Sequence, residues 1–252
     1  MFVSDKFIFL ELHKTGTTYI SGVLKALVGG EHVLKHNPAR PDQLRGKVVL
    51  GSIRDPWDWY VSLWAYGSDG RGSLHNRIMR NSKAVELQSA YTDSKDAAAF
   101  REWLRMMHDP AQRRFFSRSY AKSSAADFVG FMTFRYLQLF CRKRKQKMPE
   151  FSSAAEIARY EEERCLVDHF IRNEDLSASL YRVLELTGVR VPEIRRTELF
   201  PARANASSRK KGTSHYYDEA SAKLVEQSEW LIIDKFGYRP PQVQEERLQA
   251  AS

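Results

Sequence analysis

The chain reads His13-Lys14-Thr15-Gly16-Thr17-Thr18-Tyr19 between an apolar run and an amphipathic one. The run before it is Phe7–Leu10, and the run after it repeats apolar residues at helical spacing from Ile20 to Leu27. This order predicts a buried strand, a tight turn at Gly16 and a helix directly after the turn. Backbone N–H groups at the start of a helix are unpaired and favour an anion. The stretch therefore predicts a loop that holds a phosphate or a chemically similar oxyanion, with Lys14 and the threonine hydroxyls as further donors.

The loop differs from the version found in nucleotide triphosphatases. That version reads G-x-x-x-x-G-K-[ST], and its hydroxyl after the lysine holds magnesium. Here Lys14 precedes the only glycine of the loop, so no hydroxyl follows a Gly-Lys pair. This register favours phosphosulfate over triphosphate, and it predicts a site that uses cationic side chains and backbone amides without a metal.

A second buried-strand pattern, Val48–Ile53, runs into Arg54-Asp55-Pro56. Asp55 suits a helix N-cap and Pro56 suits the first helical position, so a helix is predicted to follow. Arg54 falls at the carboxyl end of the strand, where open α/β sheets bind ligands, and its planar guanidinium bonds phosphate oxygens in pairs. The helix carries apolar residues at i, i+3, i+4 and i+7 that are predicted to be core: Trp57, Tyr60, Val61 and Trp64.

The two stretches together resemble the signatures of cytosolic, bacterial-type sulfotransferases that use 3'-phosphoadenosine 5'-phosphosulfate. The loop is similar to P-K-[ST]-G-T-T-W, with His13 at the proline position and Tyr19 at the tryptophan position. Arg54 and Ser62 match R-[ND]-P-x-x-x-x-x-S, the family's 3'-phosphate motif. The resemblance implies an enzyme that transfers a sulfuryl group to a hydroxyl or amine of a carbohydrate, lipid or other small molecule. Adenosine 3',5'-bisphosphate is the second product.

The resemblance also implies roles for single residues. Arg54 and Ser62 would bind the 3'-phosphate, and Tyr19 would stack near the adenine. Near the C-terminus, Arg209-Lys210-Lys211-Gly212 is similar to the family's basic loop over the 3'-phosphate. Its candidates are Arg209, Lys211 and Gly212. The residues that would hold the 5'-phosphosulfate are Lys14, Thr15, Gly16, Thr17 and Thr18.

The reaction needs a base, because the acceptor loses a proton as it attacks sulfur. His36 follows the predicted strand His32–Lys35, and in many cytosolic sulfotransferases a histidine after the second strand is the base. Some carbohydrate sulfotransferases use a glutamate instead, and Glu31 lies close by in the sequence. Both residues remain candidates. Lys14 would stabilise the charge that develops on the departing phosphate.

Strand patterns alternate with helical ones over much of the chain, which predicts an α/β fold. We expect a single domain over residues 1–252 with a P-loop kinase-like core, a central parallel sheet flanked by helices. Residues from about 66 to 164 are predicted to be a helical insertion on the acceptor side, and the tail from about 239 to 252 to be poorly ordered. The predicted strands are Phe7–Leu10, His32–Lys35, Val48–Ile53 and Leu166–Ile171. Within the insertion the predicted helices are Ala97–Met107, Ala126–Cys141 and Ala154–Arg164. Beyond it, Phe170–Leu176 is similar to the family's strand that ends in R-x-E-x-L, although a capped structural helix explains it equally well.

The net charge is +9, which fits either a polyanionic nucleotide or a nucleic acid. No zinc-finger or RNA-binding pattern accompanies the charge, so nucleic acid is not predicted as a partner. The basic run 142–147 indicates a solvated helix end or a contact with an acidic partner. Two cysteines, Cys141 and Cys165, stand far apart without ligand-like spacing, and they imply neither a disulfide framework nor a zinc site.

No signal-peptide pattern or membrane-length apolar run is present, which predicts a cytoplasmic enzyme. Two other functions stay open: a P-loop small-molecule kinase, and a non-catalytic basic module that binds nucleic acid or acidic glycan. The sequence leaves the acceptor and the oligomeric state open. The histidines outside the two motifs are predicted to be surface or capping residues: His75, His108, His169 and His215.

Overall fold

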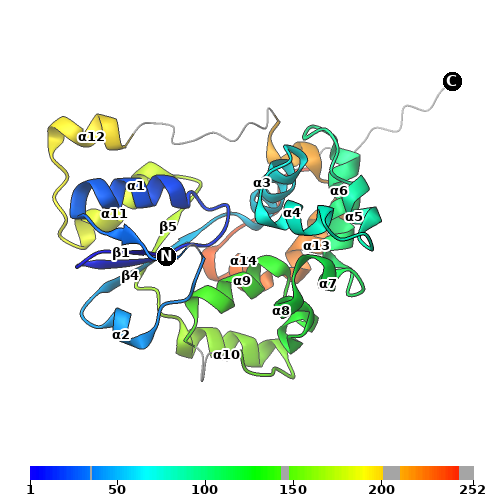
Figure 1. The fold of residues 1–252 in the computed structure, drawn as a ribbon, viewed down its shortest axis with the longest axis horizontal. Helices are drawn as coiled ribbons and strands as arrows, with labels where there is room; N and C mark the ends of the chain where they lie inside the picture. Colours follow the sequence, from blue (N-terminus) through cyan, green and yellow to red (C-terminus); the bar gives the residue numbers. More distant parts are fainter. Residues whose placement is uncertain (35, 143–147, 201–210, 244–252) are drawn as a thin grey trace. The chain divides into compact units, whose positions relative to one another are not determined.

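The structure is a computed structural model that describes residues 1–34, 36–142, 148–200 and 211–243 (Figure 1). The chain divides into two compact units. The first is built from Met1–Asp55 and Met132–Ser207, and the second from Pro56–Phe131 and Ser208–Ser252. Residues 66–164, predicted as an insertion, contribute to both units, since those after Phe131 belong to the first.

The first unit contains a five-stranded mixed sheet with the order β3-β1-β2-β4-β5. Strands β2, β4 and β5 run parallel, whereas β1 pairs antiparallel with both β2 and β3. The expected parallel sheet is thus limited to three of the five strands. The strands are β1 (Phe2–Val3), β2 (Phe7–Leu10), β3 (Glu31–His32), β4 (Val48–Ile53) and β5 (His169–Arg172).

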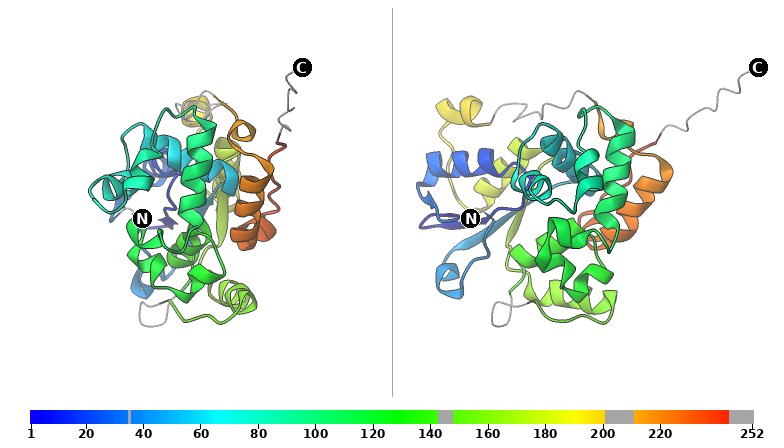
Figure 2. Two further views of the ribbon diagram at one scale, coloured as in Figure 1. Left: turned by 90° about the vertical axis from the view of Figure 1, so that its right-hand side faces the viewer. Right: turned by 45° about the vertical axis from the view of Figure 1, so that its right-hand side comes forward.

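Side chains alternate between the two faces of this sheet, and helices cover both. On one face Phe7, Phe9 and Ile171 pack with the apolar sides of α1 (Thr17–Val28) and α11 (Leu176–Leu186), which Figures 1 and 2 show side by side. On the other face Phe170 stacks on Tyr136 of α9 (Phe131–Phe140), with ring centroids 5.9 Å apart. Because the central strands are covered on both faces, all four residues of β2 are buried.

Three shorter or peripheral helices complete the described part of the first unit. They are α2 (Pro41–Leu44), α10 (Ala154–Arg164) and α12 (Glu193–Leu199).

The second unit contains helices and no strand within its described residues (Figure 2). Its core is aromatic: the predicted stripe of α3 is fully buried, and the Trp64 ring packs edge-on against Phe100 at 5.6 Å. The indole N–H of Trp57 donates to the carbonyl of Ala222, 2.9 Å away. The helices are α3 (Pro56–Ser68), α4 (Ser73–Met79), α5 (Val85–Ser89), α6 (Ala97–His108), α7 (Arg113–Phe116), α8 (Arg118–Ala121), α13 (Glu219–Ser228) and α14 (Trp230–Phe236), with short 3-10 turns at Ser124–Asp127 and Thr213–Tyr216.

Three predicted elements are corrected by the structure. The predicted strand His32–Lys35 is observed as β3 (Glu31–His32), because its pairing partner β1 has only two residues, and Val33 and Leu34 lie outside the strand. The predicted strand Leu166–Ile171 begins only at His169, because the Asp168 side chain accepts a hydrogen bond from the backbone N–H of Val49 just before pairing starts. The predicted helix Ala126–Cys141 is interrupted at Gly130, whose N–H donates to the carbonyl of Ser228 instead of an intrahelical partner.

Four predictions fall wholly or partly outside the described residues. They concern Lys35 at the end of the predicted second strand, most of the basic run 142–147, Arg209 of the C-terminal basic loop, and the tail beyond residue 243.

Candidate functional site

The loop between β2 and α1 has an unusual backbone. Lys14 takes a φ of 61° and Gly16 a φ of 79°, so two of three consecutive residues are left-handed. Such a conformation is uncommon for a residue with a Cβ, and it concentrates at ligand-binding sites. Gly16 is also the N-cap of α1, and no side chain caps the helix there. The first N–H groups of α1 therefore retain the property that makes a helix N-terminus an anion site.

Gly16 is required by its surroundings as well as by its φ. A Cβ at this position would lie 2.6 Å from Cδ2 of Leu176 and 3.1 Å from Nδ2 of Asn173. Leu176 opens α11, and Asn173 directly follows β5. The turn of the loop is therefore packed closely against the end of β5 and the start of α11.

The threonines of the loop divide into one inner and two outer residues. Thr15 is fully buried, and its hydroxyl donates to the carbonyl of Leu12 at 2.7 Å and lies 2.6 Å from Oγ of Ser52 in β4. The Thr15 side chain therefore holds the loop against Leu12 and β4. Thr17 and Thr18 open α1, Thr17 partly buried and Thr18 exposed.

Arg54 lies at the carboxyl end of β4, and its Nη1 donates to the carbonyl of Lys14 at 2.9 Å. The adjacent backbone N–H of Asp55 donates to the Glu174 carboxylate at 2.6 Å, just after β5. Thus the residues that follow β2, β4 and β5 meet at one edge of the sheet. This edge is the place where open α/β sheets bind ligands.

His36 also lies beside the loop. Its φ of 57° is left-handed, and its ring stacks on His13 with centroids 3.5 Å apart and planes 17° from parallel. Nδ1 of His36 is 2.7 Å from the carbonyl oxygen of Glu11, an atom that can only accept. Nδ1 therefore carries the proton, and the lone pair of the neutral ring is on Nε2. Among the described residues, no hydrogen bond engages Nε2 of His36.

The stacked partner takes the opposite tautomer. Nδ1 of His13 is 3.4 Å from Nη2 of Arg135, and a guanidinium only donates, so Nδ1 of His13 accepts. Burial, with smaller contributions from Arg135 and His36, lowers the pKa of His13 to about 2. Burial also lowers the pKa of His36 below its ordinary value, although the carbonyl and carboxylate of Glu11 oppose that shift. Both rings are therefore neutral near pH 7.

Glu11 anchors this part of the unit. Its carboxylate is almost completely buried, accepts from the hydroxyl of Ser21 at 3.0 Å, and lies 3.3 Å from Nδ1 of His32. It also forms a 3.0 Å ion pair with the amino group of Met1. The network fixes Glu11, whose carbonyl in turn orients His36.

The other candidate base lies apart from this arrangement. Glu31 is exposed in the edge strand β3, and no hydrogen bond or ion pair among the described residues joins it to the loop. The structure thus brings His36, and not Glu31, to Lys14 and Gly16 through His13.

Tyr19 links α1 to its neighbours through its hydroxyl. The hydroxyl donates to the carbonyl of Leu199 at 2.6 Å and lies 3.1 Å from Oγ of Ser177. Burial raises the pKa of Tyr19, so the phenol stays protonated.

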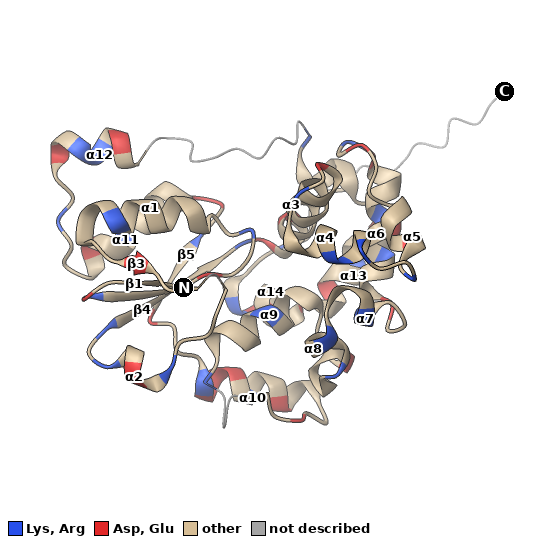
Figure 3. Ribbon diagram, viewed as in Figure 1, with Lys and Arg blue, Asp and Glu red and all other residues tan. Residues whose placement is uncertain are grey.

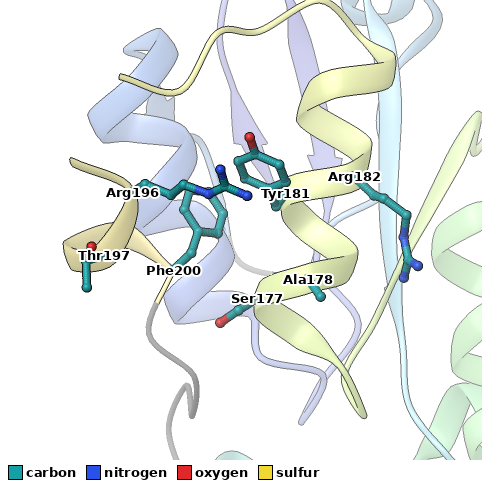
Figure 4. Close-up of a pocket in the computed structure, with 7 residues that line it drawn as sticks. All are labelled: Ser177, Ala178, Tyr181, Arg182, Arg196, Thr197 and Phe200. Carbon is teal, nitrogen blue, oxygen red and sulfur yellow. The ribbon is translucent and has the colours of Figure 1, made fainter. Parts of the chain in front are cut away.

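A cavity of about 610 Å³ lies between α11 and α12, and Ser177 is part of its wall (Figure 4). The guanidinium of Arg196 sits 4.5 Å from the ring centroid of Tyr181, and the Phe200 ring meets Tyr181 edge-on at 5.4 Å. Figure 4 shows Arg182 pointing away from this group, and it pairs with Asp175 at 2.7 Å. The sequence of helix α12 contains both basic and acidic residues, coloured blue and red in Figure 3. The cavity combines aromatic faces with hydroxyls and a cation, which suits a planar aromatic ligand.

The remaining predicted residues belong to the second unit. Ser62 is buried within α3, and Lys211 and Gly212 are exposed just before the 3-10 turn at Thr213–Tyr216. No group of three or more metal-ligating side chains occurs among the residues that the structure describes. Within the same residues, no helix has the length and apolar character needed to cross a membrane.

The sequence placed His13 in the loop without a role, and it gave no indication that Glu11 and Arg135 belong to the site. The sequence could have singled out Arg135, because it is the one charged residue of helix α9. A lone charge among buried apolar residues indicates a specific partner. Glu11 gave no comparable signal, since its role depends on tertiary contacts.

Comparison of the chain with protein-family models, with curated proteins and with solved structures finds no significant match in any of the three.

Proposed function

We propose that this chain is a sulfotransferase that uses 3'-phosphoadenosine 5'-phosphosulfate and modifies a hydroxyl or amine. The observation that carries the proposal is the loop at Lys14–Gly16: a left-handed backbone, an N-cap without a side-chain partner, and Arg54 bonded to the carbonyl of Lys14. The position of this loop after a parallel strand supports a P-loop kinase-like core, and we infer a cytoplasmic enzyme that needs no metal.

Anion binding is assigned to the loop backbone and its neighbouring cations. The N–H groups from Gly16 onward would bind the oxygens of the 5'-phosphosulfate, and Lys14 would neutralise the charge that develops on the bridging oxygen. Arg54, at the carboxyl end of β4, would bind the 3'-phosphate. The donor supplies an activated sulfuryl group and leaves as adenosine 3',5'-bisphosphate.

His36 is proposed as the general base. Its Nδ1 proton is held by the Glu11 carbonyl, so Nε2 presents the lone pair that accepts the proton of the acceptor's hydroxyl or amine. The bond from acceptor oxygen or nitrogen to sulfur forms as the bond from sulfur to the bridging oxygen breaks. His13 would hold the ring in place by stacking. A lowered pKa keeps His36 neutral and ready to accept a proton near pH 7.

The adenine is assigned to the cavity between α11 and α12. Tyr19, which the resemblance associates with the adenine, reaches the wall of this cavity through Ser177. Tyr181 and Phe200 offer aromatic faces, and the guanidinium of Arg196 would be displaced from Tyr181 to make room for a purine.

The test is a transfer assay with donor labelled on sulfur and a panel of carbohydrate, lipid and phenolic or amine acceptors. We expect label in at least one acceptor, with equimolar adenosine 3',5'-bisphosphate released. A parallel assay uses ATP labelled on its terminal phosphate with magnesium. Transfer of that phosphate, without transfer of sulfur, would show a P-loop kinase and reject the proposal. Tight binding of nucleic acid or acidic glycan without either transfer would favour the binding module.

A further inference from the structure

The two cysteines of the chain lie opposite each other in the first unit. Cys141 directly follows α9, and Cys165 is the C-cap of α10. They form an isolated antiparallel β-bridge, flanked by two backbone hydrogen bonds. The N–H of Arg142 donates to the carbonyl of Arg164 at 2.7 Å, and the N–H of Leu166 donates to the carbonyl of Phe140 at 2.8 Å. Sequence separation gave no indication of this pairing.

The bridge places the cysteines at a position suited to a disulfide. The two flanking bonds make Cys141 and Cys165 a non-hydrogen-bonded pair, in which opposed Cα atoms lie about 4.5 Å apart. Disulfides span Cα separations of about 4.4–6.8 Å, so the typical separation of a non-hydrogen-bonded pair falls within the range that a disulfide can link. Opposed residues of an antiparallel pair also project their side chains to the same face. Both residues are reduced thiols in the structure.

The two thiols differ in access. Cys141 is 2% exposed, whereas Cys165 is partly exposed. The hydroxyl of Tyr136 lies 3.7 Å from Sγ of Cys165 and bonds to the buried carboxylate of Glu161 at 2.6 Å, which fixes the surroundings of Cys165. An oxidant therefore reaches Cys165 first, and Cys141 is placed to resolve the oxidised sulfur.

We propose that Cys141 and Cys165 form a reversible intramolecular disulfide when the protein meets a peroxide. The thiolate of Cys165 attacks the peroxide O–O bond, which gives a sulfenic acid and releases hydroxide, neutralised by the thiol proton to water. The sulfur of Cys141 then attacks that sulfenic sulfur and displaces the second water. Two electrons pass from the two thiols to the peroxide, and a dithiol reductant reverses the step.

The disulfide would join α9 covalently to the segment that enters β5. Helix α9 also carries Arg135, the guanidinium beside His13, and β5 begins at His169, shortly after Cys165. Oxidation would thus stiffen two elements that hold the candidate site, while the assignment of the disulfide itself does not depend on the proposed function.

Peptide mapping tests the proposal on the wild-type protein. Peroxide is added to the full chain, remaining thiols are alkylated, and the protein is cleaved after arginine without reduction. We expect residues 136–142 and 165–172 to appear as one linked peptide from monomeric protein, and as two separate peptides after a dithiol reductant. Because the chain has two cysteines, no other intramolecular disulfide can form.

Two variants complete the test. Cys141→Ser is expected to stop at a sulfenic acid on Cys165 that a dimedone probe labels, and Cys165→Ser is expected to react much more slowly at Cys141. Oxidation should raise the unfolding temperature of the wild type and leave that of both variants unchanged. Separate peptides after peroxide treatment, or a linkage found only in covalent dimers, would overturn the proposal.

Discussion

Each unit of the molecule holds a histidine whose pKa is lowered by burial, but the two side chains are used differently. In the second unit His108, the last residue of α6, has partners on both nitrogens: the carbonyl of Leu104 at 2.8 Å and Oγ of Ser228 at 3.0 Å. In the first unit, the ring of His36 forms a hydrogen bond through Nδ1 alone among the described residues. A histidine bonded on both sides caps and holds structure, as predicted for His108, whereas one bonded on one side has a nitrogen left for proton transfer.

The backbone shows the same contrast. Among the residues that the structure describes, the two left-handed ones that carry a Cβ are Lys14, within the loop, and His36, beside it, and both belong to the first unit. Strain of this kind costs on the order of 1–3 kcal/mol for each residue and persists where its surroundings fix it. The buried carboxylate of the second unit, Glu229, instead accepts from Tyr60 at 2.5 Å within a dense aromatic core. The left-handed residues of the first unit thus lie at the proposed site, whereas the buried carboxylate of the second unit is held within a packed core.

The largest effect is expected for His36→Ala, which removes the proposed base. Turnover should fall by about 100- to 10,000-fold, the usual contribution of a positioned base, while the affinity for adenosine 3',5'-bisphosphate stays near that of the wild type. The matched variant Glu31→Gln should retain turnover, because Glu31 is exposed and apart from the loop. Loss of activity in Glu31→Gln with an active His36→Ala would assign the base to Glu31.

The same site predicts a pH dependence in the wild type. The rate should rise with pH as His36 loses its proton, since only the neutral ring accepts one. Because burial lowers the pKa of His36, this rise should be complete at a lower pH than for an ordinary histidine of pKa 6.5. If the rise in rate were centred above pH 6.5, or if it persisted in His36→Ala, the ionisation that controls the rate would belong to another group.

Lys14→Ala should have the next largest effect, a loss of about 100- to 1,000-fold in turnover, as found when one stabilising donor is removed from a developing anion. Binding of the bisphosphate product should weaken only modestly, because the charge on the bridging oxygen grows in the transition state. Lys25→Ala, an exposed lysine on α1, is the control and should behave as wild type. Wild-type turnover in Lys14→Ala would remove Lys14 from the mechanism.

Arg54→Ala should act mainly on binding. Loss of a charged hydrogen bond costs about 1.5–3 kcal/mol, which raises the Kd for adenosine 3',5'-bisphosphate by about 10- to 150-fold. The Kd for adenosine 5'-monophosphate should change less, since that ligand lacks the 3'-phosphate. Arg40→Ala, an exposed arginine paired with Asp42, controls for the loss of surface charge. If Arg54→Ala preferred the bisphosphate over the monophosphate as strongly as the wild type does, Arg54 would not bind the 3'-phosphate.

The smallest effect on turnover is expected for His108→Gln, which should change stability instead. Burial lowers the pKa of His108 to about 4, so between pH 6.5 and 4 the unfolded chain binds more protons than the folded one. The free energy of unfolding should therefore decrease as the pH falls through that window, and His108→Gln should reduce this decrease. Denaturant titrations at pH 7 and pH 4.5 measure it. A large loss of turnover at pH 7 in the folded variant would contradict the contrast with His36.

The sequence predicted the parts of the fold that depend on local pattern. Phe7–Leu10 and Val48–Ile53 match β2 and β4 because fully buried strands are continuous apolar runs. Ala154–Arg164 matches α10, whose cap at Ser153 accepts from the N–H of Glu156. The two-residue strand β1 is too short to show an alternating pattern and was not predicted, and β3 was predicted one residue late and too long, as His32–Lys35. The antiparallel pairing of these two strands was therefore not predicted.

The sequence predicted the site residues that belong to motifs, but not those that only the tertiary fold brings to the site. Lys14, Gly16 and Arg54 belong to motifs with fixed spacing, and the structure brings them together at one sheet edge. The stacking of His13 on His36 depends on the left-handed backbone at His36 and on the carbonyl of Glu11. The pairing of Cys141 with Cys165 depends on where α9 and α10 end. Such contacts are set by the tertiary fold and leave no local periodicity.

The most direct test of the central claim is a calorimetric titration of the wild-type protein with three nucleotides. These are adenosine 3',5'-bisphosphate, adenosine 5'-monophosphate, and ATP with magnesium. We expect the bisphosphate to bind at least about 10-fold more tightly than the monophosphate, since Arg54 adds a charged contact. ATP with magnesium should bind more weakly than the bisphosphate. Tighter binding of ATP that depends on magnesium, or no preference for the 3'-phosphate, would contradict the central claim.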